Sequence, residues 1–164
     1  METLINRIKQ FLILSSVMIV GISFLIVLMP FILLFLVYAY FKNKLFLKDY
    51  KNYLQTINGT KFFCYNNRKT GINFIEENII PKLSSDIKII FLNGTTPESE
   101  YETKYISEAL YKIKDRKGFP YLLKVEKKQI IDKSINKIVY NAICQNNKLE
   151  NVFLDIKDFY TKTH

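Results

Sequence analysis

The sequence predicts an α/β protein in which a single N-terminal transmembrane helix precedes a domain of order β-α-β-α-β-β-α. Two observations lead to this fold class. Residues 11–41 contain no charged side chain, and the later apolar runs, short enough for strands, alternate with segments of helical periodicity. The expected organisation is a tail over 1–10, the span over 11–41, a juxtamembrane helix or linker over 42–59, and the domain with a C-terminal helical extension over 60–164.

The uncharged run is 31 residues long. As a helix it would measure roughly 45 Å, more than the ~30 Å hydrocarbon core of a bilayer. Pro30 can kink this helix, and tilt can accommodate the excess length. A cleaved signal peptide is the alternative, but its apolar region would be shorter and would end in small residues, whereas this run ends in the aromatic stretch 37–41. A retained anchor is therefore expected.

Four lysines follow the span, namely Lys42, Lys44, Lys48 and Lys51. Basic flanks favour the side of the membrane on which the chain is made, so the domain should face the cytoplasm or the mitochondrial matrix. The same lysines are expected to contact anionic lipid headgroups. Helical spacing of apolar residues up to position 57 indicates a helix that continues the span or lies on the lipid surface.

The composition is basic, with a net charge of +9. Such a charge suits nucleic acid, an anionic membrane or an acidic partner. No stretch clusters lysines with stacking aromatics, so a nucleic-acid partner is not expected. The abundance of Lys, Asn, Ile, Phe and Tyr reflects AT-rich codons, as in an organelle, a reduced bacterium, some protists or a large virus.

The domain has alternating strand and helix signals. Residues 93–103 have the composition of a polar, acidic loop, and the spacing of Ser99 and Glu102 predicts a capping box at the next helix. Asn58-Gly59 and Asn93-Gly94 are interpreted as turns, although both begin glycosylation sequons. The expected strands are 61–65, 87–92, 121–125 and 129–132, and the expected helices are 71–83, 105–113, 135–143 and 149–156.

The element order, with Gly118-Phe119-Pro120 directly before the third strand, resembles the thioredoxin fold over about residues 60–145. In that family a cis-proline opens the third strand and faces the active-site loop after the first strand, and Pro120 matches this proline. The family's Cys-x-x-Cys would fall near residues 66–69, which read Asn-Asn-Arg-Lys. Dithiol exchange needs a reactive thiolate with a resolving partner, so the resemblance implies a redox-inactive member.

Five residues are the candidates for a site. Arg68 and Lys69, facing Pro120 if the resemblance holds, are a possible anion site, as in the glutathione-binding relatives; the simpler interpretation is solvated loop charges. Cys64 lies inside a predicted strand and is expected to be a core thiol. Cys144 lies off the apolar stripe of its helix and is expected to be more exposed. A redox role for either thiol is the weaker interpretation.

Other catalytic signals are missing from the sequence. The only histidine, His164, is the last residue, which argues against Ser/His and Cys/His nucleophile systems and against a His/Cys metal cluster. The glycines form no phosphate-binding motif. The adjacent Glu76 and Glu77, and the acidic residues over 98–102, are interpreted as solvated charges, although the second group is also able to dock a basic partner. Neither a metal nor a cofactor is expected.

The preferred functional hypothesis is a membrane-anchored structural or interaction protein, a non-catalytic accessory subunit of a larger membrane complex. Some accessory subunits of respiratory complexes resemble this arrangement, so an organelle-encoded respiratory-chain subunit is one form of it. The expected partners are the bilayer and the other subunits of the complex. The alternative is a membrane-tethered thioredoxin- or glutathione-type oxidoreductase that uses Cys64 or the groove at Arg68. A third hypothesis is a tether that binds anionic lipid or a soluble partner through residues 42–51.

Overall fold

The computed structural model describes residues 2–145 and 149–162. The chain divides into two compact units, Met1–Lys48 and Asp49–His164. Helix α1, Glu2–Thr56, makes up the first unit and continues into the second. The helix therefore continues without a break from the apolar run to Thr56, which is one of the two arrangements that the helical spacing indicated.

The first unit is a helix with apolar side chains on all sides. The segment Lys9–Thr56 is long and apolar enough to cross a membrane. Its serines satisfy their own hydroxyl groups, because Ser15, Ser16 and Ser23 donate to carbonyl oxygens one turn earlier at 2.8–2.9 Å. A polar group in lipid is tolerated when it has an internal hydrogen-bond partner, so these serines do not conflict with a span.

The second unit, called the α/β domain below, contains a mixed five-stranded sheet of order β3-β2-β1-β4-β5. The central strand β1 runs parallel to β2 and antiparallel to β4. The outer strands β3 and β5 are each antiparallel to their neighbour. The strands are β1 (Lys61–Asn66), β2 (Ile87–Asn93), β3 (Thr96–Glu98), β4 (Tyr121–Glu126) and β5 (Gln129–Ser134).

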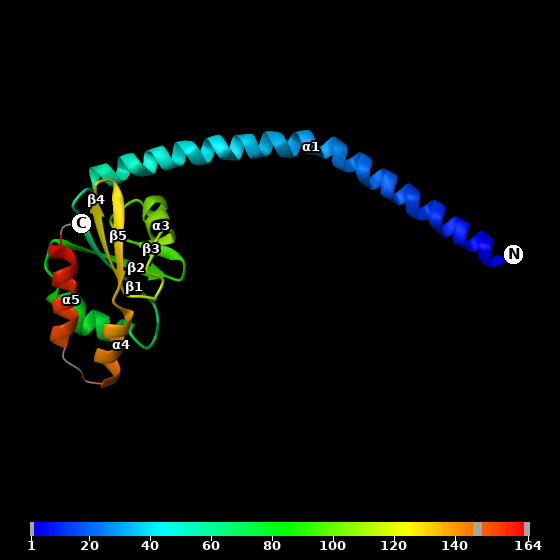
Figure 1. Cartoon of the computed structure of the whole chain (residues 1–164). Helices are drawn as coiled ribbons and strands as arrows, with labels where there is room; N and C mark the ends of the chain where they lie inside the picture. The colour runs from blue at the N-terminus through cyan, green and yellow to red at the C-terminus, as the bar shows by residue number, and fades with distance from the viewer. Residues whose placement is uncertain (1, 146–148, 163–164) are drawn as a thin grey trace. The chain divides into compact units, whose positions relative to one another are not determined.

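Helices cover both faces of the sheet (Figure 1). On one face, Phe63 and Leu122 pack against α4 and α5 and against the helical segment after β1, and this core includes Val139 and Ile156. On the other face lie α3 and the end of α1. The helical elements are α2 (Ile72–Phe74), the π-helix η1 (Ile75–Ile79), the 3-10 helix η2 (Ile80–Lys82), α3 (Thr103–Tyr111), α4 (Asn136–Gln145) and α5 (Leu149–Thr161).

The α/β domain begins at Asp49, earlier than the boundary at residue 60 that the sequence indicated. Tyr50 and Leu54 are only 4% and 3% exposed. The ring of Tyr53 stacks on that of Tyr105 in α3, with centroids 4.5 Å apart. Because these side chains complete the core on the α3 face, the last two turns of α1 belong to the domain and are not a linker.

Three local expectations are corrected. The predicted helix 71–83 is split into α2, η1 and η2, because Pro81 has no N–H for regular α-helical hydrogen bonding. The loop after β2 contains the short strand β3, joined to β2 by the turn at Gly94, whose φ is +63°. The capping box is wrong: the Glu102 side chain makes no cap hydrogen bond, and the Ser99 hydroxyl accepts the N–H of Tyr101 at 3.2 Å.

The turn between β4 and β5 contains two residues in a backbone conformation that is unfavourable for residues other than glycine. Its two central residues, Lys127 and Lys128, have φ of +50° and +62°. This left-handed conformation costs an L-residue with a Cβ roughly 1–2 kcal/mol, and glycine avoids that cost. We expect Lys128→Gly to raise the free energy of unfolding of the domain by about 0.5–1 kcal/mol, after the entropic cost of glycine.

Urea unfolding of the full chain in a neutral detergent, followed by the near-ultraviolet circular dichroism of its tyrosines, measures this effect. Lys128→Ala is the matched control, because it removes the same charge and keeps a Cβ. A gain as large with alanine as with glycine would show that the charge, and not the backbone conformation, limits stability.

Candidate functional site

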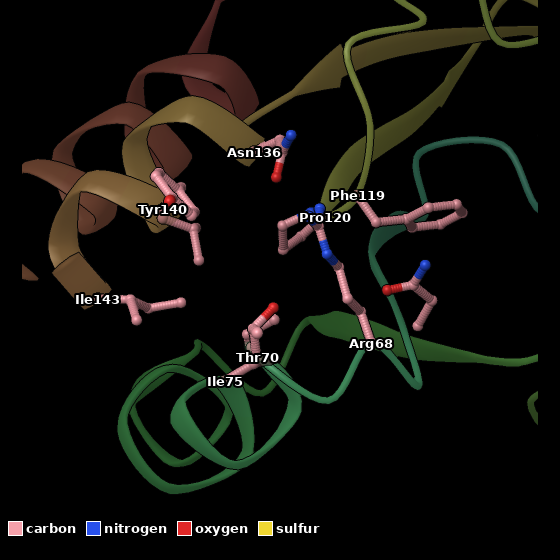
Figure 2. A pocket seen from close by; sticks show the side chains of 11 residues that line it. Arg68, Thr70, Ile75, Phe119, Pro120, Asn136, Tyr140 and Ile143 are labelled. Atoms are coloured by element: carbon pink, nitrogen blue, oxygen red, sulfur yellow. The ribbon is translucent and has the colours of Figure 1, made fainter.

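A small cavity lies at the carboxyl end of β1, between the loop after that strand, Pro120 at the start of β4, and helix α4 (Figure 2). Three distant parts of the sequence meet there because β1 pairs with β4 and the chain passes directly from β5 into α4. The residues that line the cavity are Asn66, Arg68, Thr70, Gly71, Ile75, Phe119, Pro120, Asn136, Val139, Tyr140 and Ile143.

The loop after β1 is held by its backbone. The N–H of Asn67 donates to the carbonyl of Leu92 at 3.2 Å, which continues the pairing of β1 with β2. The carbonyl of Arg68 accepts the N–H groups of Gly71 and Ile72 at 3.0 and 3.1 Å. The N–H groups of Gly71 and Ile72 are therefore engaged within the chain and are not available to bind an anion.

Arg68 and Pro120 both line this cavity. Figure 2 shows the Arg68 side chain extended toward Pro120. The Phe119-Pro120 peptide bond is cis. Lys69 is exposed and does not line the cavity. Of the two cations that the sequence singled out, the structure brings only Arg68 to this place.

The loop before Pro120 is tied to the following segment by side chains. Asp132 accepts the N–H groups of Lys114 and Asp115 at 3.1 and 2.8 Å. The Asn136 amide donates to the carbonyl of Lys117 at 2.9 Å, and the Ser134 hydroxyl donates to the carbonyl of Gly118. Since Asn136 also lines the cavity, the wall around Pro120 is positioned from the end of β5.

Gly118 is required by this arrangement. Its φ is +99°, and a Cβ at this position would lie 3.0 Å from Nδ2 of Asn136. Any other residue would therefore strain the backbone and crowd the amide that holds the loop. Because the regular part of α3 ends at Tyr111, Gly118 belongs to the loop before β4 and not to the end of that helix.

Asp115 gives the loop a pH dependence. Its carboxylate accepts the N–H of Ser134 at 3.1 Å and pairs with Lys117 at 3.1 Å. Burial opposes ionisation of this carboxyl, but the Ser134 hydrogen bond and the charge of Lys117 lower its pKa below the usual range. The charged form is thus more favourable in the folded domain than in the unfolded chain.

We expect the stability difference between the native chain and Asp115→Asn to depend on pH. A lowered carboxyl pKa contributes stability above the unfolded pKa of about 4, and this contribution is lost as the pH falls through the folded value. Urea unfolding at neutral pH and at about pH 3 should show an advantage of the native chain only at neutral pH. An advantage that persists or grows in acid would contradict this assignment.

The cavity suits at most a small polar ligand. Its volume is ≈ 30 Å³, enough for one or two water molecules and far below the roughly 300–1,000 Å³ of typical ligand sites. Its polar groups are amides, hydroxyls and one guanidinium, and no carboxylate, thiol or histidine lines it. It therefore offers hydrogen bonding and one positive charge, without a nucleophilic thiol or a carboxylate or imidazole base.

Neither thiol belongs to this cavity. Cys64 is completely buried in β1, and burial raises the pKa of its thiol. Cys144 is exposed in α4. Both described cysteines are free thiols, so neither is joined to a resolving cysteine as dithiol exchange requires.

The remaining sequence candidates are placed as follows. Lys42, Lys44, Lys48 and Lys51 are all exposed on α1. Among residues 2–145 and 149–162, no cluster of three or more His, Cys, Asp or Glu side chains is arranged to hold a metal ion. His164 lies outside the described residues.

Several of the acidic side chains that the sequence suggested were solvated charges form hydrogen bonds or ion pairs within the domain. Glu76 accepts the hydroxyl of Tyr65 at 2.9 Å, while Glu77 is exposed. In the acidic segment, Glu100 pairs with Lys88 at 3.2 Å, and Glu98 accepts the amide of Asn93 at 3.1 Å. These contacts stabilise the edge of the sheet, so the acidic segment is partly neutralised within the domain.

Sequence reasoning missed Asn136 and Tyr140, which line the cavity together with Arg68. They come from α4, and no local pattern marks a polar residue that lines a cavity formed by distant segments. Helical periodicity placed the apolar side of α4 correctly, with Val139 buried. Comparison of the chain with protein-family models, with curated proteins and with solved structures finds no match.

Proposed function

We propose that this protein is a single-span membrane protein whose α/β domain is a redox-inactive, thioredoxin-like interaction module of a larger membrane assembly. The observation that carries the proposal is the composition of the loop in which a thioredoxin-type dithiol would lie. Beside Pro120, the loop after β1 carries Asn66-Asn67-Arg68-Lys69, and both cysteines lie outside the cavity.

Two further features support the thioredoxin-like assignment. The parallel pair β1 and β2 is followed by the hairpin of β4 and β5 and then by helix α4. Pro120 directly precedes β4 and lies opposite the loop after β1. The short strand β3 is an addition at the sheet edge, beyond the element order on which the resemblance rests.

Membrane anchoring is supported by the length and the uniformly apolar surface of α1 between residues 11 and 41. The lysines that follow this run favour a domain on the cytoplasmic or matrix side. The two cysteines provide a test of this orientation, because Cys144 is exposed while Cys64 is buried.

A membrane-impermeant maleimide, added to intact cells or organelles, should not label the protein until the membrane is permeabilised. After permeabilisation, the native chain should take up one label, and Cys144→Ser should take up none. Labelling of Cys144 before permeabilisation would place the domain on the opposite side. Loss of the first 40 or so residues from the intact 19.4 kDa chain would favour a cleaved signal peptide.

The interaction role is tested by native gel migration of gently solubilised membranes, with mass spectrometry of the proteins that migrate with the chain. Migration with one large, defined complex is expected. Migration alone, near the mass of the chain plus detergent, would contradict an accessory-subunit role.

The oxidoreductase alternative is tested on the full chain in a neutral detergent. We expect no reduction of a model disulfide above the level of the double variant Cys64→Ser/Cys144→Ser. If the native chain reduces the disulfide and the double variant does not, the redox-inactive assignment is wrong. Cys144→Ser alone would then show whether the exposed thiol is the reactive one.

A further inference from the structure

A second, larger hollow lies at the opposite end of the sheet from Pro120. It is bounded by η2 and the turn before β2 on one side and by α5 on the other. Its volume is ≈ 520 Å³, within the range of small-molecule sites. We call it the α5 groove. Its apolar lining includes Leu83, Ile87 and Phe153, and its basic lining comprises Lys61, Lys82 and Lys157.

The apolar lining results from the way α5 packs. This helix buries Val152, Ile156, Phe159 and Tyr160 against the sheet, while Phe153 is only half-buried and faces the groove. The hydroxyl of Tyr160 donates to the carbonyl of Phe62 at 2.6 Å. With its polar end engaged in that hydrogen bond, Tyr160 presents mainly its ring to the groove.

The basic lining is only partly neutralised. Lys61 pairs with Asp86 at 2.6 Å and lies 5.8 Å from the centre of the Tyr160 ring. Lys82 and Lys157 are exposed and form no ion pair with any residue in the described ranges. Asp86 is the one carboxylate among the groove residues, against three lysines. The groove therefore combines an apolar floor with an excess of positive charge at its edge.

An anionic amphiphile matches both properties, because an apolar tail needs the floor and an anionic head needs unpaired cations. β1 begins at Lys61, shortly after α1 ends at Thr56, so the groove is at the end of the sheet where the chain arrives from α1. If α1 is in a bilayer, as proposed above, the anionic amphiphile present in greatest amount is membrane lipid.

We propose that the α5 groove binds one anionic phospholipid, with an acyl chain along Leu83, Ile87 and Phe153 and the headgroup phosphate at Lys82 and Lys157. This inference rests on the proposed membrane anchoring, and it assigns a lipid site in the α/β domain that is separate from the lysines following the span. The bound lipid would link the domain to the lipid composition of its membrane.

The test uses the full chain in a neutral detergent and a phosphatidylglycerol that carries a photoactivatable diazirine in one acyl chain. After irradiation, we expect labelled peptides from α5 and from the segment before β2. Phosphatidylcholine with the same chains should label them weakly. Glycerol phosphate, the headgroup without tails, should not compete, which distinguishes a lipid from a free phosphate.

The variant Lys82→Gln/Lys157→Gln should bind phosphatidylglycerol roughly thirtyfold more weakly, since each lysine near an anionic surface contributes about fivefold. Both side chains are exposed, so the fold should be retained, and urea unfolding checks this. Lys69→Gln/Lys137→Gln is the matched control, because it removes two exposed lysines of the same domain that do not line the groove.

Labelling of α5 that is equal with phosphatidylcholine, or that is unchanged in Lys82→Gln/Lys157→Gln, would overturn the proposal. No labelling of the groove by phosphatidylglycerol would also overturn it and would direct attention to an acidic peptide instead. Because the measurement is made in detergent, its failure is separate from a failure of membrane anchoring, which is judged by extraction of native membranes.

Discussion

Leu54→Ala should lower the free energy of unfolding of the α/β domain by about 2–5 kcal/mol, although residue 54 lies in the helix that begins as the apolar span. The side chain is 3% exposed and belongs to the core on the α3 face. Truncation leaves a cavity that the packed neighbours fill only in part, so lost burial and lost contacts add together. For a domain of this size the loss is a large fraction of the total stability.

Urea unfolding of the full chain in detergent, followed by the near-ultraviolet signal of the tyrosines, measures this loss. Leu45→Ala is the matched control, because Leu45 is in the same helix, in the first unit, and is 62% exposed. Equal, small effects of both substitutions would mean that the domain begins near residue 60 and that the end of α1 is a linker.

The second large effect concerns the membrane anchoring proposed above for the apolar run of α1. Replacing Ile22, Leu25 and Val27 together by lysine should abolish stable membrane insertion. A lysine near the centre of a transmembrane helix costs roughly 3 kcal/mol on insertion scales, so three such residues cost about as much as the apolar run gains. Val27 lies on the side of the helix opposite Ile22 and Leu25, so one polar face cannot shelter all three lysines.

Alkaline carbonate extraction of membranes gives the readout. The native chain should remain in the pellet, and the triple-lysine variant should move to the supernatant. The control exchanges the same residues for other apolar ones, Ile22→Leu, Leu25→Ile and Val27→Leu, and should behave as the native chain. Extraction of the native chain itself by carbonate would contradict membrane anchoring.

The two predictions concern two parts of α1 that place different demands on their side chains. Between residues 11 and 41 the proposed anchoring depends only on an apolar helix surface, so any apolar residue of similar size should support it. From Asp49 onward individual side chains are placed against particular neighbours, as Tyr53 is against the ring of Tyr105 and the N–H of Glu102. In the first part we therefore expect any apolar replacement to be tolerated. In the second part we expect only replacements of closely similar shape to be tolerated.

Much of the secondary structure could be predicted from local pattern. The run KFFCY predicts a buried strand, and β1 contains it with Phe63 and Cys64 fully buried. The run IKIIFL lies within β2. Errors occurred where a weak local signal competed with tertiary contacts. Strand β3 is polar and short, and it forms by pairing with β2 at the sheet edge.

Only some residues of the candidate site could be predicted from the sequence. Arg68 and Pro120 were found because their place in the element order is informative. Asn136 and Tyr140 were not found, because they reach the cavity through the connection from β5 to α4. The α5 groove was missed entirely, since Lys82 and Lys157 are far apart in sequence and each resembles an ordinary surface lysine.

The sequence by itself determined the apolar helix, four of the five strands of the sheet and the absence of a Cys-x-x-Cys motif, because each is a property of a short continuous stretch. Only the tertiary structure decided where the α/β domain begins, which cation lies beside Pro120 and which lysines border an apolar groove. These features depend on strand pairing and on the packing of α3, α4 and α5 across the sheet. Such packing brings together side chains whose separation along the chain carries no periodic signal.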